Sequence, residues 1–225
     1  MAMLDNDQHT IVSDAVGAAE LSTSGEIVTV LARSSDGYTD VALVWAIAVA
    51  FTAMSIFAVF PAFFLGLWDG LFHGGWASEW TMGQVLTLML GFGLVKFVGV
   101  LLVQLWQPLR MFLIPGPIKC ARVRSAAIRH FKVGAEKRTH GRTGVLIYLS
   151  MAEHRAEIVA DNAIAAKVPA EVWGLAMADM LVEIRKGCTA EGIAAGVRDV
   201  GVVLAEHFPR GAEDVNELPD RLIEL

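Results

Sequence analysis

Two carboxylates near the ends of predicted strands are the side chains that best suit a cation. Asp36 follows the apolar segment 26–31, and Asp161 ends a second such segment. Loops at strand ends can gather oxygen ligands around a hard cation. Glu26 begins its strand, so it should lie away from Asp36. We therefore expect Asp36 and Asp161 to share a weak Ca²⁺ or Mg²⁺ site; in the alternative, Asp161 and Asn162 cap the next turn.

No nucleophile stands in a phosphatase pattern. A cysteine phosphatase needs an Arg six positions after its nucleophile, but Cys120 and Cys188 are followed there by Ala126 and Ala194. The six histidines form neither an HxH nor an HExxH pattern, so zinc chemistry is not indicated. The residues by themselves therefore give no support to covalent phosphoryl transfer.

A single charge interrupts the second of two long apolar segments. Residues 41–60 are uncharged, and residues 85–106 contain only Lys96. A lysine at the centre of a membrane span costs about 2.5–3.5 kcal/mol and is a candidate functional group. Thr52 and Ser55 lie at a similar depth, and their hydroxyl oxygens could accept hydrogen bonds from the Lys96 ammonium group. In the alternative, Lys96 extends its ammonium group to the lipid headgroups.

Both apolar segments are long enough to cross a membrane, because 20 helical residues cover about 30 Å. The segment between them contains Trp68, Trp76 and Trp80, which suit a membrane–water interface. It has no Lys or Arg, whereas many bases follow the second span. Both termini are therefore expected on the cytoplasmic side of the inner membrane, with residues 68–84 outside. These bases are Arg110, Lys119, Arg122, Arg124, Arg129, Lys132, Lys137, Arg138 and Arg142.

The basic segment is expected to lie on the bilayer. Residues 119–138 predict a helix whose apolar side, including Val123 and Phe131, faces the protein. Basic side chains near anionic lipid contribute about 1 kcal/mol each. The same bases also suit a signal that only fixes the topology. The net charge of −6 argues against a nucleic-acid partner. The expected lipid-headgroup contacts are Lys119, Arg122, Arg124 and Arg129.

The composition is typical of a membrane protein with a folded part outside the bilayer. The chain is 55% hydrophobic and 19% charged, with a mean hydropathy of +0.52, whereas soluble proteins are about 25% charged. The first two predicted strands are expected to pair in parallel, and the last two to form an antiparallel hairpin. Strands are predicted at 26–31, 143–150 and 155–161, and helices outside the spans and the basic segment at 7–22, 171–186 and 191–208.

Three stretches of the sequence resemble the TPM domain family. They read TSGEIVTVLARSSDGYTDV, TGVLIYLSMAEHRAEIVADNAIAAKVPAEVW and GCTAEGIAAGVRDVGVVLAEHFP. The family includes a thylakoid lumen protein tied to photosystem repair and many bacterial membrane-tethered proteins. The resemblance implies a compact α/β domain with a central sheet and, for some members, acid-phosphatase activity or divalent-cation binding. Many members have a single span behind the domain, whereas here two spans lie inside it.

The prediction is an α/β chain: a small TPM-like sandwich interrupted by a two-helix transmembrane hairpin. Its parts are a helix and strand at 1–40, the hairpin at 41–106, the rest of the domain at 107–210 and an irregular acidic tail at 211–225. The favoured function is a non-enzymatic module that assists assembly or maintenance of membrane proteins. The alternatives are a cation-dependent membrane-bound acid phosphatase and a small transport or sensor subunit. Expected partners are the lipid bilayer and other membrane proteins, without nucleic acid.

Overall fold

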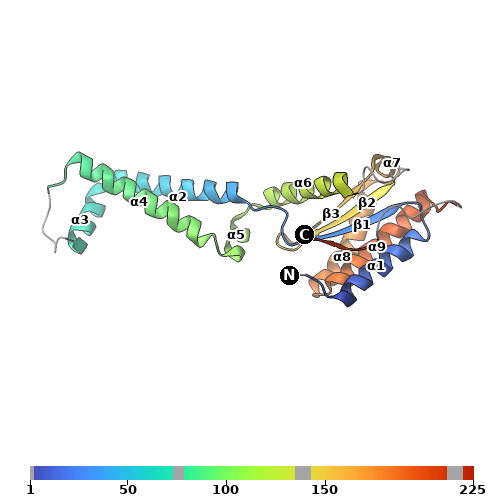
Figure 1. Cartoon of the computed structure of the whole chain (residues 1–225). Helices are drawn as coiled ribbons and strands as arrows, with labels where there is room; N and C mark the ends of the chain where they lie inside the picture. Colours follow the sequence, from blue (N-terminus) through green and yellow to red (C-terminus); the bar gives the residue numbers. More distant parts are fainter. Residues whose placement is uncertain (1–2, 73–78, 135–142, 212–219) are drawn as a thin grey trace. The chain divides into compact units, whose positions relative to one another are not determined.

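The chain folds into two compact units, seen in a computed structural model that describes residues 3–72, 79–134, 143–211 and 220–225 (Figure 1). Unit 1 comprises Met1–Asp36 and Gly116–Leu225, and unit 2 comprises Gly37–Pro115. Unit 2 is therefore an insertion between two stretches of chain that share one core.

Unit 1 is built on a four-stranded mixed sheet with the order β3-β2-β1-β4. β1 (Glu26–Ala32) pairs in parallel with β2 (Gly144–Ser150), which pairs in antiparallel with β3 (Arg155–Ala160). The predicted parallel pair and hairpin are thus confirmed. Every residue of β1 and β2 is buried, because helices cover both faces of these central strands.

The core of unit 1 lies in two layers, one on each face of the sheet. Ile27 and Leu31 of β1 point into the larger layer, whereas Val28 and Val30 point into the smaller one. The larger layer is filled from α1, α8 and α9, and the smaller one from α6. The helices of unit 1 are α1 (Asn6–Glu20), α6 (Gly116–Gly134), α7 (Asn162–Ala165), α8 (Ala170–Arg185) and α9 (Thr189–His207).

The fourth strand comes from the C-terminal end of the chain. β4 (Ile223–Glu224) pairs in parallel with β1, and the Leu225 N–H donates to the Leu31 carbonyl at 2.9 Å. The expectation of an irregular tail is therefore wrong for these last residues; residues 212–219 lie outside the described residues. A two-residue strand is too short to produce a recognisable hydrophobic pattern.

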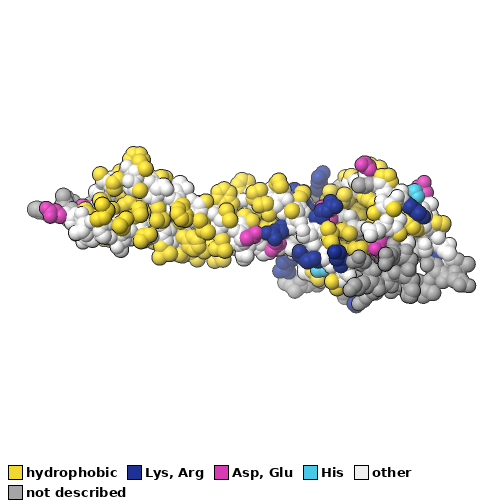
Figure 2. Space-filling model, turned by 90° about the horizontal axis from the view of Figure 1, so that it is seen from above, with side chains coloured by type: hydrophobic (Ala, Val, Ile, Leu, Met, Phe, Trp, Pro, Cys, Tyr) yellow, Lys and Arg dark blue, Asp and Glu magenta, His cyan; other side chains and the backbone are white. Residues whose placement is uncertain are grey.

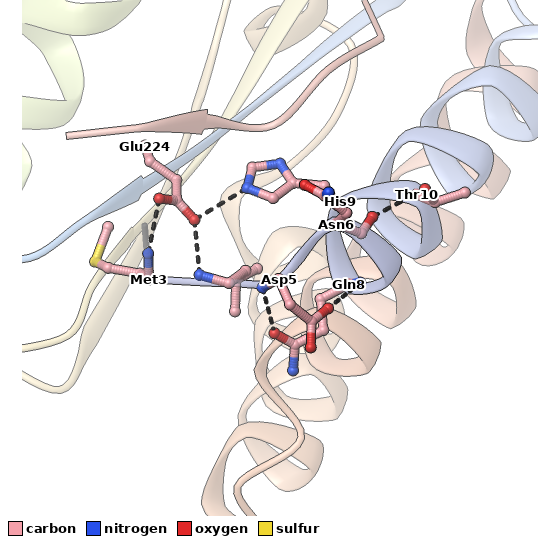
Figure 3. A network of polar contacts seen from close by, with 8 residues as sticks. Met3, Asp5, Asn6, Gln8, His9, Thr10 and Glu224 are labelled. Atoms are coloured by element: carbon pink, nitrogen blue, oxygen red, sulfur yellow. Dashed lines mark hydrogen bonds and ion pairs between the residues drawn. The ribbon is translucent and has the colours of Figure 1, made fainter. Parts of the chain in front are cut away.

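Glu224 joins the two ends of unit 1 (Figure 3). Its carboxylate accepts hydrogen bonds from the backbone N–H groups of Met3 at 2.8 Å and Leu4 at 2.9 Å. The Nε2 atom of His9 lies 3.1 Å from the same carboxylate. Three contacts from the start of the chain therefore converge on one side chain of β4.

Unit 2 is a helical hairpin with two additional helices. α2 (Thr39–Val59) and α4 (Met82–Val103) pack closely at Gly93, where an added Cβ atom would lie 2.5 Å from the Met54 sulfur. Gln104 Nε2 donates to the Ala42 carbonyl at 3.2 Å. These two contacts establish that α2 and α4 run in opposite directions. The sequence analysis missed the additional helices, α3 (Pro61–Phe72) and α5 (Gln107–Leu113).

The apolar side chains of α2 and α4 are mostly exposed. Only 22% of the apolar stretch of α2 and 6% of that of α4 are buried. In Figure 2 hydrophobic side chains cover most of the visible surface of unit 2, whereas Lys and Arg side chains gather on unit 1. By length and composition, both helices are able to cross a membrane.

Candidate functional site

A buried glutamate organises the loops at the carboxyl ends of β1 and β2. Glu153 is 5% exposed. Its carboxylate accepts hydrogen bonds from the Ser34 hydroxyl and the Ser35 N–H, both at 3.1 Å, and from the Ser150 hydroxyl. These donors come from the loop after β1 and from the end of β2. Glu153 therefore links the loop after β1 to the end of β2.

Aromatic and charged groups surround this cluster. The Tyr148 hydroxyl lies 3.2 Å from the Ser35 hydroxyl, and the His130 ring stacks on Tyr148 with 5.7 Å between centroids. Burial raises the pKa of Tyr148 and lowers that of His130. Nearby, Arg122 Nε lies 3.2 Å from an Asp36 carboxylate oxygen. Asp36, a predicted cation ligand, is thus paired with Arg122, a predicted lipid contact.

Asp161 lies at the other end of the sheet. Its N–H donates to the Gly144 carbonyl at 2.9 Å, and its carboxylate accepts from the Gly144 N–H at 3.2 Å. Gly144 is the first residue of β2 and is in register with Glu26. Asp36 follows the far end of β1, whose seven residues span roughly 20 Å. The structure therefore does not bring Asp36 and Asp161 together.

The physical reason is the hairpin. β3 runs antiparallel to β2, so a residue that ends β3 returns to the beginning of the parallel pair. Asp161 occupies the N-cap position of α7, but its side chain makes no capping hydrogen bond there. The sequence analysis set Glu26 apart from Asp161, whereas the register places both at the same end of the sheet.

A small cavity beside the start of β1 gathers several carboxylates. We call it the carboxylate cavity; its volume is about 120 Å³. Glu20 ends α1 and Glu26 begins β1, and these two glutamates are only 8% and 5% exposed. The Ile27 N–H donates to the Glu20 carboxylate at 2.8 Å. The lining residues are Gly17, Glu20, Leu21, Thr23, Glu26, Arg210 and Asp220.

Glu20 is predominantly protonated at neutral pH. Burial raises its pKa from 4.5 to about 8, and the nearby charges of Glu26 and Asp220 add to this rise, whereas the hydrogen bond from Ile27 opposes it. The cavity therefore combines one acid that holds a proton with neighbouring carboxylates. Such a site can bind or release a proton near neutral pH.

The sequence analysis missed the carboxylate cavity because its acids come from distant segments. One local signal was available. Glu20 lies in the last turn of α1, where the negative end of the helix dipole disfavours an acidic side chain. The turn that follows is fixed by Thr23, whose hydroxyl donates to the Phe208 carbonyl at 2.7 Å and accepts from the Gly25 N–H at 3.0 Å.

The described residues do not fit a ready metal site. Among them, no group of three or more His, Cys, Asp and Glu side chains is arranged to hold a metal ion. Asp36 and Asp161, the pair predicted from the sequence, lie at opposite ends of the sheet and therefore cannot share one ion. Among the residues that the structure describes, those lining the carboxylate cavity include no Cys, His or Ser.

The polar residues of the two long apolar helices remain apart. The hydroxyls of Thr52 and Ser55 donate to carbonyls of their own helix, those of Ala48 at 2.7 Å and Phe51 at 2.8 Å. The Lys96 ammonium lies 5.2 Å from the centroid of the Phe92 ring on α4. In the part of unit 2 that the structure describes, no hydrogen bond joins Lys96 to either hydroxyl.

The predicted lipid contacts lie on α6. Val123 and Phe131 bury the apolar side of this helix against the sheet. Arg124 and Arg129 are exposed, and Lys119 is half-buried. α6 therefore keeps basic groups accessible, although Arg122 is engaged by Asp36 as described above.

Comparisons with known proteins agree with this fold. The NMR structure of the BA42 protein from the psychrophilic bacterium Bizionia argentinensis has a TM-score of 0.57 and 17% sequence identity to this chain. The alignment covers 100% of this chain and 97% of that one, and at this identity it shows the fold alone. No curated protein matches at a significant level. Residues 121–203, from α6 to α9, match the TPM domain model, so the predicted resemblance to the TPM domain family is confirmed.

Proposed function

We propose that this chain is a membrane-anchored TPM-domain protein that assists assembly or maintenance of other membrane proteins without catalysing a reaction. The observation that carries the proposal is the insertion of unit 2, with its exposed apolar helices, into the TPM-like fold. Long helices that expose apolar side chains over most of their length suit a lipid environment. In this proposal unit 2 spans the inner membrane and unit 1 stays in the cytoplasm.

The described residues support a non-enzymatic role. The buried polar cluster around Glu153 has its hydrogen bonds directed to loop groups rather than to an open site. Cys120 is exposed on α6 and Cys188 precedes α9, and neither lines the carboxylate cavity. Thr23 lines that cavity, but its hydroxyl donates to the Phe208 carbonyl and accepts from the Gly25 N–H, so it is engaged in holding the turn.

Anchoring and orientation are tested on the full chain in bacterial membranes. We expect it to stay in the membrane pellet after an alkaline carbonate wash. A cytoplasm-active reporter fused after Leu225 should be active, and an exported reporter placed after Gly70 should be active on the other side. Release by carbonate, or an exported reporter at Leu225, would contradict the proposal.

The role in maintenance is tested by measuring the half-lives of membrane proteins in cells that lack the chain. A subset of membrane proteins should be degraded faster, and the full chain should restore their half-lives. The Val30→Asp variant, which disrupts the unit 1 core, should not restore them. Unchanged half-lives for all membrane proteins would exclude this role.

A second candidate function is cation-dependent phosphomonoester hydrolysis, which the TPM resemblance implies for some family members. Its test is turnover of p-nitrophenyl phosphate by the purified full chain, with Ca²⁺ or Mg²⁺ and with a chelator. A low-charge site should bind Ca²⁺ in the range of roughly 10⁻⁴ to 10⁻³ M. Calorimetric titration of wild type, Asp161→Asn and Glu20→Gln would identify the ligands. Metal-dependent turnover that is lost in either variant would replace the first proposal.

A further inference from the structure

Unit 2 contains an apolar groove of about 730 Å³ that opens beside α3 and α4. We call it the α3–α4 groove. Its aromatic wall consists of Phe57 from α2, Phe64 from α3 and Phe92 from α4, with ring centroids 4.9 to 6.1 Å apart. Trp80 continues the wall toward the start of α4 and donates from Nε1 to the Asp69 carboxylate at 3.2 Å.

A row of small residues forms the other side of the α3–α4 groove. Gly83, Thr87 and Gly91 follow one another at four-residue spacing along α4 and all line the groove. A Cβ atom added at Gly83 or Gly91 would meet nothing within 4 Å, whereas one at Gly93 would collide with Met54. Gly93 thus serves packing inside the hairpin, but Gly83 and Gly91 leave open space.

Such a row is suited to a neighbouring helix. In membranes, small residues at four-residue spacing let a second helix backbone approach closely. The groove runs along α4 from Gly83 to Val95, twelve residues or about 18 Å, which is more than three helical turns. An acyl chain would also fit an apolar groove, but it has no need of a glycine row.

Lys96 supplies the charge that selects the occupant. It follows Val95 at the end of the groove, and its ammonium lies against the groove residue Phe92. Among the described residues no carboxylate contacts it. Ionisable groups inside a membrane pair with an opposite charge, and lipid headgroups lie at the membrane surface rather than at this depth. The complement of Lys96 is therefore a carboxylate on a transmembrane helix.

A second copy of this chain does not supply that carboxylate. The contacts of Gly93 with Met54 and of Gln104 with Ala42 place Lys96 level with about Phe51 on α2. Asp40 lies eleven residues from Phe51, or about 16 Å. Asp69 is held by Trp80 beside the start of α4, about 21 Å from Lys96. Copies inserted at the same depth would therefore face Lys96 with apolar residues and the hydroxyls of Thr52 and Ser55, but not with a carboxylate.

We propose that the α3–α4 groove docks a transmembrane helix of a different membrane protein, one that carries an Asp or Glu at the depth of Lys96. The helix lies along the row of Gly83, Thr87 and Gly91, and its carboxylate pairs with the Lys96 ammonium. This inference rests on the proposed function, because it requires unit 2 to span the membrane, and it names the class of partner that the module would assist.

The test uses two synthetic transmembrane peptides in phosphatidylcholine vesicles that contain the full chain, labelled at its N-terminus. Both peptides are 22-residue Leu/Ala helices with lysines at their ends, and they differ only in a Glu or a Gln at the depth of Lys96. Energy transfer measures binding. We expect the Glu peptide to bind about three- to tenfold more tightly than the Gln peptide, since polar contacts between membrane helices are modest in strength.

Matched variants separate the groove from the rest of α4. Lys96→Met should abolish the preference for Glu. Gly91→Leu should fill the groove and weaken binding of both peptides at least tenfold. Leu86→Phe is the control, because Leu86 is exposed on α4 but does not line the groove. This control should bind both peptides as wild type does.

Equal binding of the Glu and Gln peptides by wild type, or unchanged binding by Gly91→Leu, would overturn the inference. Vesicles made with brominated lipid provide a further readout. If bromine quenches Trp80 strongly in wild type but not in Gly91→Leu, and no peptide relieves the quenching, lipid occupies the groove and the inference is wrong. Carbonate extraction is measured on the same preparation. Retained anchoring without a Glu preference rejects this inference alone, whereas failed anchoring rejects the proposed function.

Discussion

The two units use apolar, glycine-containing helices in opposite ways. In α9 of unit 1, nine of 19 residues are buried, whereas in α4 of unit 2 Gly93 is the buried residue among 22. An added Cβ at Gly192 of α9 would lie 2.9 Å from the Met180 carbonyl oxygen, and one at Gly201 would lie 2.7 Å from the Ala19 Cβ. By contrast, a Cβ atom added at Gly83, Gly91 or Gly99 of α4 would meet nothing within 4 Å.

The difference concerns the surroundings for which each helix is built. α9 is amphipathic, so one side packs on protein and the other faces water. α4 is apolar around its whole circumference and packs on protein at only a few positions. A helix of that kind is stable where the surrounding medium is itself apolar. Sequence hydrophobicity alone does not separate these cases, but the contacts of individual residues do.

The largest expected effect comes from placing a charge in each unit. Val30→Asp buries an unpaired carboxylate in β1, where Val30 is 3% exposed, and should cost about 4 kcal/mol or more, a large part of a domain's stability. Leu94 of α4 is 63% exposed, so Leu94→Asp should leave unit 1 intact. Pulse proteolysis of the full chain in detergent measures both.

The same pair has a second readout. Leu94→Asp should weaken membrane retention, because an acidic residue within a span costs about 2.5–3.5 kcal/mol on insertion. Val30→Asp should not change retention. A Leu94→Asp variant that loses unit 1 would mean that α4 is part of a protein core, and the contrast between the two units would fail.

The second effect is a pH dependence centred on Glu20. Its folded-state pKa of about 8 lies above the unfolded value of 4.5, so the folded chain binds the extra proton. Stability should therefore be greatest below about pH 4.5 for this group and should fall as the pH rises toward 8, by on the order of 3 kcal/mol. Urea denaturation between pH 5 and 8.5 measures this slope.

Glu20→Gln should remove most of that slope and should be more stable than wild type at pH 8. Its amide oxygen can still accept from the Ile27 N–H. Glu206→Gln, on the exposed side of α9, is the control and should keep the wild-type slope. A slope that survives in Glu20→Gln would show that another group titrates.

The third effect tests the glycines directly. Gly201→Ala forces a methyl group against Ala19 of α1 and should destabilise unit 1 by about 1–3 kcal/mol. Gly99→Ala on α4 meets open space and should not destabilise the chain, since alanine is the better helix former. Equal losses for the two variants, measured by pulse proteolysis, would indicate that α4 packs on protein at Gly99 as tightly as α9 does at Gly201.

The smallest effect concerns Glu224. Burial tends to raise its pKa, but the hydrogen bonds from Met3, Leu4 and His9 outweigh burial and lower it. The carboxylate therefore stabilises the fold above its unfolded pKa, and this contribution is lost as the pH falls through the lower folded value. Glu224→Gln should cost about 1 kcal/mol at pH 7 and less under acid conditions.

Hydrogen exchange at the amides of Met3 and Leu4 measures the same contact locally. Exchange should accelerate in Glu224→Gln, while amides in the middle of β2 should keep their protection. Unchanged exchange at the two N-terminal amides would show that Glu224 does not hold this end of the chain.

The local elements of unit 1 were largely predictable, whereas its functional arrangement was not. β1, β2 and β3 have strong apolar, β-branched patterns, and α1, α8 and α9 have helical periodicity. The helices α3 and α5 escaped prediction because Gly, Pro and Trp in their segments suggested loops. β4 was not predicted because two residues are too few to show a periodic hydrophobic pattern.

The site could not be predicted for a different reason. Whether Asp161 lies near Asp36 or near Glu26 depends on the direction of β3 relative to β2, and strand ends alone do not reveal which ends meet. The cavity at Glu20 is also lined by Asp220 and Arg210, which come from the far end of the chain.

The sequence by itself determined the two long apolar segments, the clustering of bases after the second one, the parallel pair with its hairpin, and the TPM resemblance. The first three follow from composition and short-range periodicity within the segments, whereas the resemblance rests on three matching stretches of sequence. The tertiary structure alone decided that Glu20, Glu26 and Asp220 share a cavity and that Gly83 and Gly91 face open space along α4. Contacts between segments far apart in the chain are set by packing and register, so no local pattern could specify them.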